Sequence, residues 1–188
     1  SHLEIVARGN RNPFDMAYDD GFDWLATDND QNLGDKFFSP FFGAHFGWGH
    51  PWSYDWEGND HWPSAPSSGP LFEGSGAGVI YLGLDRFPDK YRGVFLVNDW
   101  LKRQVYIYRP KWDGAWMKPS SDRLELFADA ERGRSMKQSK GRRFDPVDIE
   151  LGPDGAIYIS SWGRDYGAVV EDGQQQNEGR IYKLWPKA

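Results

Sequence analysis

Two segments of the sequence repeat the same order of features, and this repeat constrains the fold more than any other property of the chain. Each copy reads as an outer strand, a loop, an inner strand, an Asp-Gly hairpin turn and a second strand. The first copy runs through 3–7, 12–18, 20–21 and 24–28, and the second runs through 124–128, 145–151, 154–155 and 156–162. Recurrence of matching pieces in the same order predicts a repeat protein.

The middle of the chain supplies a fuller unit. Strands are expected at 78–82, 93–98, 104–108 and 124–128, and four antiparallel strands repeated radially make the blade of a β-propeller. A sandwich or a simple meander is the alternative, but neither requires the same turn chemistry at matched positions. The predicted fold class is therefore all-β, a β-propeller of four-stranded antiparallel blades with about three blades present.

Composition supports an all-β protein and excludes several function classes. The sequence contains ten Trp, nine Tyr and twelve Phe together with 22 Gly and 12 Pro. Aromatic residues are common in strands, and Gly and Pro are common in the turns between short strands. A net charge of −6 argues against a nucleic-acid partner, which requires a basic surface. The sequence has no cysteine, so thiolate chemistry and disulfides are excluded. It also has no apolar run that approaches the ~20 residues of a transmembrane segment.

The predicted units are 9–77, 78–130 and 131–188, with 3–7 as an additional strand. A propeller closes with about four to eight blades, so three units leave the ring incomplete. The rest of a longer chain or other copies of this chain would complete it, and the first alternative is preferred.

Several short motifs resemble the glucose/sorbosone dehydrogenase family, in family order through nearly the whole chain. They are Arg11-Asn12-Pro13, Thr27-Asp28-Asn29-Asp30, Gly43-Ala44-His45-Phe46-Gly47-Trp48, Phe87-Pro88-Asp89-Lys90-Tyr91-Arg92-Gly93, Asp99-Trp100-Leu101-Lys102-Arg103 and Gly152-Pro153-Asp154-Gly155. The resemblance implies that the chain corresponds to the C-terminal half of a six-bladed propeller and that the protein is periplasmic or extracellular. The sequence is also similar to propeller domains described as membrane-bound dehydrogenases in large proteins of environmental bacteria.

Members of that family oxidise a sugar or alcohol with pyrroloquinoline quinone and Ca²⁺ at the mouth of the central channel. The resemblance implies that Arg11 and Asn12 lie beside the cofactor and that Asp35 is an active-site carboxylate. It likewise implies that Lys102, with Arg103 beside it, binds the quinone, although a charged hairpin tip is the structural alternative.

Two departures weaken the match to a complete dehydrogenase site. Asp145 and Val147 stand where the family has paired arginines, and Arg143, with Arg142 before it, is the nearest substitute. The family's catalytic histidine belongs to an earlier blade that this sequence does not include.

The acidic run 28–35 offers hard oxygen ligands, and Asp28 and Asp30 are the candidate Ca²⁺ ligands. A solvated turn rich in side-chain hydrogen bonds is the alternative. His45, His50 and His61 match no zinc spacing, and His45 is expected to shape the turn before Trp48.

The stretch 48–56 is unusually aromatic. Trp48, Trp52 and Trp56 are candidate carbohydrate contacts because indole rings stack on sugar faces. The alternative is a long loop packed by its own rings.

Three functions stay open at this point. The first is a sugar or alcohol dehydrogenase module that binds a quinone and Ca²⁺ in the central channel. The second is a carbohydrate- or protein-binding propeller without catalysis. The third is a Ca²⁺-dependent lactonase-type hydrolase, which requires Asp28 or Asp35 to point into the channel with Asn12, Asn98 or Asp148.

Overall fold

The computed structural model describes residues 1–29, 35–48, 65–70, 75–83, 87–121, 123–129, 144–163 and 179–185. Within these ranges the regular structure is almost entirely β-strand, and the helical part is one 3-10 turn at Asp89–Tyr91. No helix in the described part of the chain is long and apolar enough to cross a bilayer.

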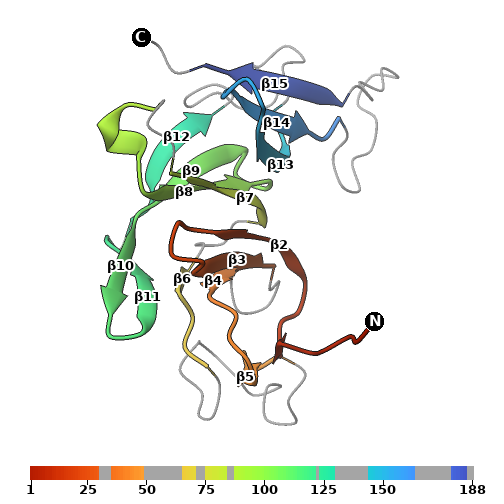
Figure 1. Ribbon diagram of the computed structural model, residues 1–188. Coiled ribbons are helices and arrows are strands. Elements are labelled where there is room, and N and C mark those ends of the chain that lie inside the picture. The colour runs from red at the N-terminus through yellow and green to blue at the C-terminus, as the bar shows by residue number, and fades with distance from the viewer. Residues whose placement is uncertain are drawn as a thin grey trace.

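Three antiparallel sheets radiate from a common centre, as blades of a propeller do (Figure 1). Blade 1 contains β2 (Pro13–Tyr18), β3 (Trp24–Asp28), β4 (Lys36–Phe38) and β6 (Gly69–Pro70). Blade 2 contains β7 (Gly76–Leu82), β8 (Val94–Asp99), β9 (Gln104–Tyr108) and β12 (Glu125–Asp129). Blade 3 contains β13 (Pro146–Leu151), β14 (Ile157–Ser161) and β15 (Arg180–Leu184). The fold class predicted from the sequence is confirmed, and the three blades form an open fan.

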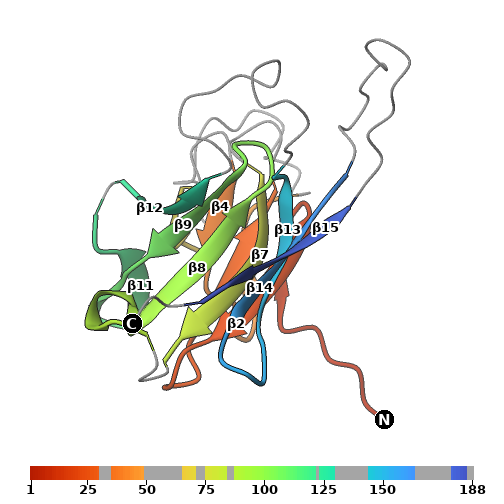
Figure 2. The same cartoon turned by 90° about the horizontal axis from the view of Figure 1, so that it is seen from above.

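The innermost strands of the fan are β2, β7 and β13, which lie side by side in Figures 1 and 2. They begin close to the predicted starts, and the Asp-Gly turns join β2 to β3 and β13 to β14 as expected. The first turn is fixed by Asp19, whose Oδ1 accepts the N–H groups of Gly21 at 2.8 Å and Asp23 at 2.9 Å.

Two parts of the outer rim differ from the sequence prediction. The expected strand at 3–7 is absent, since β1 covers only Ala7–Arg8 and pairs in parallel with β5 (Ala44–His45). The sequence analysis also missed a hairpin between β9 and β12, formed by β10 (Pro110–Asp113) and β11 (Trp116–Pro119). Gly114, at φ 63°, supplies the left-handed residue that this turn requires.

The β10–β11 hairpin braces blade 2 against blade 1. Met117 is completely buried among core side chains of both blades. The Trp116 Nε1–H donates to the Ser67 carbonyl at 2.9 Å, just before β6. Nearby, the Tyr108 hydroxyl donates to the Ser68 carbonyl at 2.8 Å. The insertion therefore ties the outer parts of the two blades together.

Apolar side chains fill the two spaces between the blades. Along β8, Val94 and Leu96 pack with the blade 3 core, whereas Phe95 and Val97 pack with the blade 1 core. Blade 2 is thus buried on both faces, which explains why β8 reads as a continuous apolar run rather than an alternating one.

The inner strands approach one another most closely at Gly78. A Cβ atom there would lie 2.8 Å from the Asp148 Cα and 2.8 Å from the Ile149 backbone nitrogen. On the other side of β7, the Asp15 Oδ2 accepts the Val79 N–H at 2.9 Å. The close approach of β7 to β13 therefore depends on a glycine at position 78.

We expect Gly78→Ala to destabilise the protein by about 1–3 kcal/mol, because the methyl group would have to push backbone apart in a packed region. Urea unfolding measures the loss. Gly179→Ala is the matched control, since among the described residues its Cβ would meet the Ser161 carbonyl oxygen at 3.5 Å, an ordinary contact. Equal stability of the two variants would contradict the close approach of β7 and β13.

Candidate functional site

A cavity of about 580 Å³ opens where the inner strands begin and the second strands end. We call it the channel-mouth cavity, because residues from all three blades line it around the central strands. Its described lining consists of Asn12, Phe14, Asn29, Ser75, Ala77, Trp100, Val147, Ser160, Ser161 and Trp162. This volume falls within the usual range for small-molecule sites.

A hydrogen-bond clamp holds the rim of the cavity in the same way in each blade. The last residue of the second strand accepts, through its side chain, the N–H of the residue that precedes the first strand. In blade 1 the Asp28 Oδ1 accepts the Asn12 N–H at 2.8 Å. In blade 2 the Asp99 Oδ1 accepts the Ser75 N–H at 3.1 Å, and in blade 3 the Ser161 Oγ accepts the Asp145 N–H at 2.8 Å.

A backbone hydrogen bond accompanies each clamp. The residue after the second strand donates its N–H to the carbonyl of the residue before the first strand. The three pairs are Asn29 to Asn12 at 3.1 Å, Trp100 to Ser75 at 2.9 Å and Trp162 to Asp145 at 2.8 Å. Asn29, Trp100 and Trp162 therefore occupy equivalent places, and all three line the cavity.

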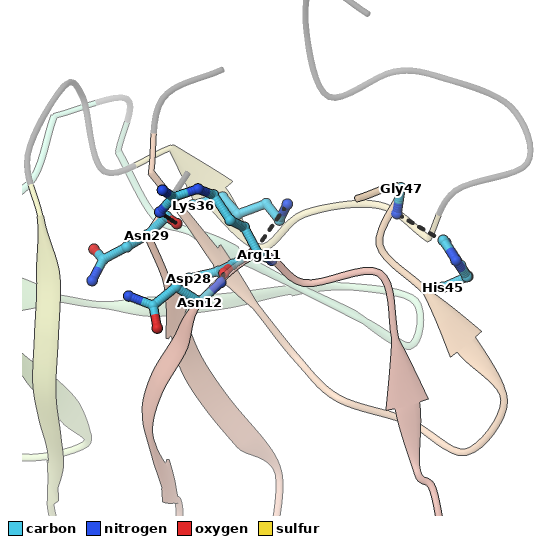
Figure 3. Close-up of polar contacts among 7 residues, drawn as sticks. All are labelled: Arg11, Asn12, Asp28, Asn29, Lys36, His45 and Gly47. Carbon is cyan, nitrogen blue, oxygen red and sulfur yellow. Dashed lines mark hydrogen bonds and ion pairs between the residues drawn. The ribbon is translucent and has the colours of Figure 1, made fainter. Parts of the chain in front are cut away.

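The blade 1 clamp contains a buried ion pair (Figure 3). The Lys36 Nζ lies 3.2 Å from the Asp28 Oδ2, and the two side chains are 3% and 0% exposed. The same Oδ2 accepts the Arg11 N–H at 3.2 Å. Asp28 thus binds backbone and an ammonium group, an arrangement that stabilises the rim.

Two tryptophans form one wall of the cavity. The rings of Trp100 and Trp162 are 5.4 Å apart with an interplanar angle of 38°, within the range of stabilising aromatic contacts. The sequence analysis missed both residues as site candidates. The signal was available, because each follows the second strand of a unit, but no aromatic residue occupies that place in the first unit.

Three buried polar groups at this rim have no hydrogen-bond partner among the described residues. They are both amide atoms of Asn98, the Asp99 Oδ2 and the Trp100 Nε1. An unsatisfied buried polar group costs about 1–3 kcal/mol. Burial also raises the pKa of Asp99, an effect that the N–H groups of Lys102 and Ser75 partly oppose.

The predicted site residues of blade 1 lie at the rim. Asn12 lines the cavity. The Arg11 guanidinium donates to the Asn29 carbonyl at 3.2 Å and lies 5.7 Å from the ring centre of Trp48. His45 Nδ1 accepts the Gly47 N–H at 3.1 Å, so it shapes the turn before Trp48 as predicted (Figure 3). Trp48 therefore contacts an arginine, and its carbohydrate role stays a prediction.

The other predicted residues are held by the protein itself. The Asp35 Oδ2 accepts the Gly76 N–H at 3.2 Å. Lys102 lies in the exposed β8–β9 turn, and its backbone N–H donates to the Asp99 Oδ1 at 2.8 Å. Arg103 has a φ of 60° and its Nε lies 2.9 Å from the buried Asp145 Oδ1, which links blade 2 to blade 3. Asp30, Trp52, Trp56 and Arg143 lie outside the described residues.

No group of three or more His, Cys, Asp or Glu side chains that could hold a metal gathers among the residues for which coordinates are described. A different set of carboxylates lies along the inner strands, on Asp15 of β2 and on Asp148 and Glu150 of β13. Burial raises the pKa of Asp15, two backbone N–H groups lower it, and the Asp148 carboxylate raises it further. Burial and the carboxylates of Asp148 and Asp15 raise the pKa of Glu150.

These raised pKa values predict a pH dependence of stability. The folded protein binds protons at Asp15 and Glu150 more tightly than the unfolded chain, so their contribution to stability increases as the pH falls from neutral toward about 4. We expect Asp148→Asn to stabilise the protein at pH 7 and to have a smaller effect at pH 4.5. Urea unfolding at both values measures this, with the exposed Glu4→Gln as control. An effect independent of pH would contradict the electrostatic coupling.

The clamps predict unequal losses of stability. Asp28→Ala leaves Lys36 as a buried unpaired charge, and we expect a loss of about 3–5 kcal/mol. Ser161→Ala leaves one buried N–H without its acceptor, and we expect about 1–3 kcal/mol. Thermal and urea unfolding measure both, with near-ultraviolet circular dichroism as a check of folding. A smaller loss for Asp28→Ala than for Ser161→Ala would show that the ion pair is dispensable.

Comparison with known proteins reveals similarity in structure only. No family model matches the chain, and no curated protein matches it either. Among solved structures, a glucose dehydrogenase superposes with a TM-score of 0.70 at 16% identity, over 98% of this chain and 47% of the other. The apo form of the soluble aldose sugar dehydrogenase from Escherichia coli gives 0.65 at 17% identity, over 98% and 47%. The PQQ-bound aldose sugar dehydrogenase from Streptomyces coelicolor gives 0.64 at 16%, over 95% and 44%.

The chain therefore spans about half the length of the structures that it resembles. At these identities the similarity concerns the fold and does not extend to activity or ligands. The chain has the fold of part of a sugar-dehydrogenase β-propeller.

Proposed function

We propose that the chain is part of a sugar- or alcohol-oxidising propeller and that the channel-mouth cavity is its substrate-binding site. The observation that carries this proposal is the position of the cavity, at the edge where the inner strands of all three blades begin. The fold shared with glucose and aldose sugar dehydrogenases supports the substrate class. Asn12 is the residue of the proposed site that both the sequence resemblance and the cavity include.

The described residues do not by themselves fit pyrroloquinoline quinone and Ca²⁺. A quinone with several carboxylates requires cations around it, yet no residue of the described lining is charged. Arg103 is paired with Asp145, and Arg11 contacts Asn29 and Trp48. Oxygen ligands for a metal are also not gathered within the described ranges. A redox cofactor would therefore depend on groups beyond these residues.

A second candidate function is carbohydrate binding without oxidation. The uncharged described lining and the engagement of Arg103 in a structural ion pair favour it. The lactonase alternative has less support, because Asp28 and Asp35 accept backbone N–H groups and neither is part of the described lining.

The open fan of blades also leads to a proposal on assembly. The rest of a longer chain or other copies of this one would supply further blades, in a periplasmic or extracellular protein. The molar mass in solution of the natural protein separates the two routes.

Oxidation is tested on the protein that contains this chain, loaded with pyrroloquinoline quinone and Ca²⁺. Dye-linked oxidation of aldoses or alcohols, reduced at least about tenfold by Asn12→Ala, is the expected result. Lys111→Ala, on the exposed β10–β11 hairpin, is the control. Saccharide binding without dye reduction would favour the second candidate. Absence of both binding and oxidation would reject the cavity as the site.

A further inference from the structure

A second cavity lies on the outer rim of blade 2, away from the channel mouth. It has a volume of about 200 Å³, and its described lining consists of residues 107, 109, 119–121 and 123–125. These residues belong to the end of β9, to the start of the outermost strand β12 and to the turn that joins β11 to β12. We call it the outer-rim pocket. It shares no described lining residue with the channel-mouth cavity, so a ligand there is independent of the proposed oxidation.

The described lining of the outer-rim pocket contains one more cation than anion. Arg109 and Arg123 are the cations, and Glu125 is the anion. The Arg109 Nε and Nη2 both donate to the Glu125 Oε2, at 3.2 and 2.8 Å, so these two charges neutralise each other. The Arg123 guanidinium has no ion pair or hydrogen bond within the described ranges. The pocket therefore contains one guanidinium whose charge is not neutralised.

Two serine hydroxyls lie on the same turn as this arginine. The Ser120 N–H donates to the Arg109 carbonyl at 2.8 Å, and the Arg123 N–H donates to the Ser121 Oγ at 3.2 Å. These bonds fix the backbone of the turn. Because the Ser121 oxygen accepts from backbone, its own proton remains able to donate to a ligand. The Ser120 hydroxyl is not engaged by any residue that the structure describes, so the turn offers two hydroxyl donors beside the guanidinium.

We propose that the outer-rim pocket binds the tetrahedral oxyanion of a small phosphate or sulfate monoester, which Arg123 neutralises. Such a group has three terminal oxygens, and a guanidinium with two hydroxyls supplies a donor for each of them. A carboxylate has two oxygens in one plane, and a single guanidinium already satisfies both. The tetrahedral group therefore uses the donors of the turn more completely than a carboxylate does.

The size and the other walls of the pocket limit the ester. The volume of about 200 Å³ is below the range of about 300–1,000 Å³ that is usual for drug-sized ligands. The remaining lining is apolar and consists of Ile107, Pro119 and Leu124. The pocket thus suits the oxyanion together with a few carbon atoms of its alcohol. Since the net charge of the chain is −6, long-range attraction does not favour anions, and affinity depends on these local contacts.

Ligand-observed saturation-transfer NMR on the protein tests the proposal, because it detects weak binding. Methyl phosphate and methyl sulfate are the probes, and acetate is the planar control, all at an ionic strength of about 0.1 M. We expect saturable binding of at least one ester and at least about tenfold weaker binding of acetate. The pH dependence separates the two esters. Methyl phosphate should bind more tightly as the pH rises through about 6, where it gains its second charge, whereas the affinity of methyl sulfate should stay constant.

Variants of the charged residues locate the binding. Arg123→Ala should weaken ester binding at least about tenfold, and Arg123→Lys should recover part of this loss, because it keeps the charge without the planar fork. Arg8→Ala is the matched control, since it removes the same charge from an exposed residue of β1 outside the pocket. Glu125→Gln should strengthen binding about threefold, because it removes the carboxylate that competes for Arg109.

Three results would overturn the proposal: no binding of either ester, equal binding of acetate, or equal losses in Arg123→Ala and Arg8→Ala. Near-ultraviolet circular dichroism checks that each variant is folded. If Arg123→Ala does not fold, Glu125→Gln decides, because tighter ester binding in that variant cannot come from a damaged fold. Unchanged or weaker binding by Glu125→Gln would then reject the pocket as an oxyanion site.

Discussion

The clamp between the end of each second strand and the start of each first strand is the interaction on which the rest of the structure depends. It fixes where an inner strand begins, and so it aligns the three blades around the channel. Blade 1 uses Asp28, blade 2 uses Asp99 and blade 3 uses Ser161. A carboxylate and a hydroxyl can both form the clamp, because each provides an oxygen that accepts the N–H of the residue before the first strand. The fold requires an acceptor there, and the identity of the acceptor varies.

The identity of the clamp acceptor changes the local electrostatics of each blade. In blade 1 an ammonium group from Lys36 neutralises the carboxylate. In blade 2 the residue at the corresponding register is Gln104, paired with Asp99 across the strands. The Asp99 Oδ1 accepts two backbone N–H groups, whereas its Oδ2 has no partner within the part of the chain that the structure describes.

Much of the fold could be predicted from the sequence, because strands with apolar alternation and Asp-Gly turns carry local signals. The inner strands and β9 lie where those signals place them. The β10–β11 hairpin was missed although Asp113-Gly114 at its turn carries the same Asp-Gly signal. The burial of Met117 against another blade is a tertiary contact that no local pattern reveals. The site was predicted less well. Asn12 was found, whereas Trp100 and Trp162 were missed although each follows the second strand of a unit in the sequence, and the clamps show that they occupy equivalent positions.

The residues that line the cavity and the residues that hold its frame are neighbours in sequence but separate in role. In each blade the clamp acceptor is followed directly by a residue that lines the cavity: Asn29, Trp100 and Trp162. The frame bonds that accompany the clamps use the backbone N–H groups of these three residues. Exchange of one of their side chains would therefore leave these backbone bonds in place, although the Asn29 Oδ1 also accepts the Ser75 hydroxyl at 3.2 Å and the Trp100 and Trp162 rings contact each other. Such a scaffold offers a modular route to new ligand specificities, since three single-residue libraries would cover one wall of the cavity and part of another.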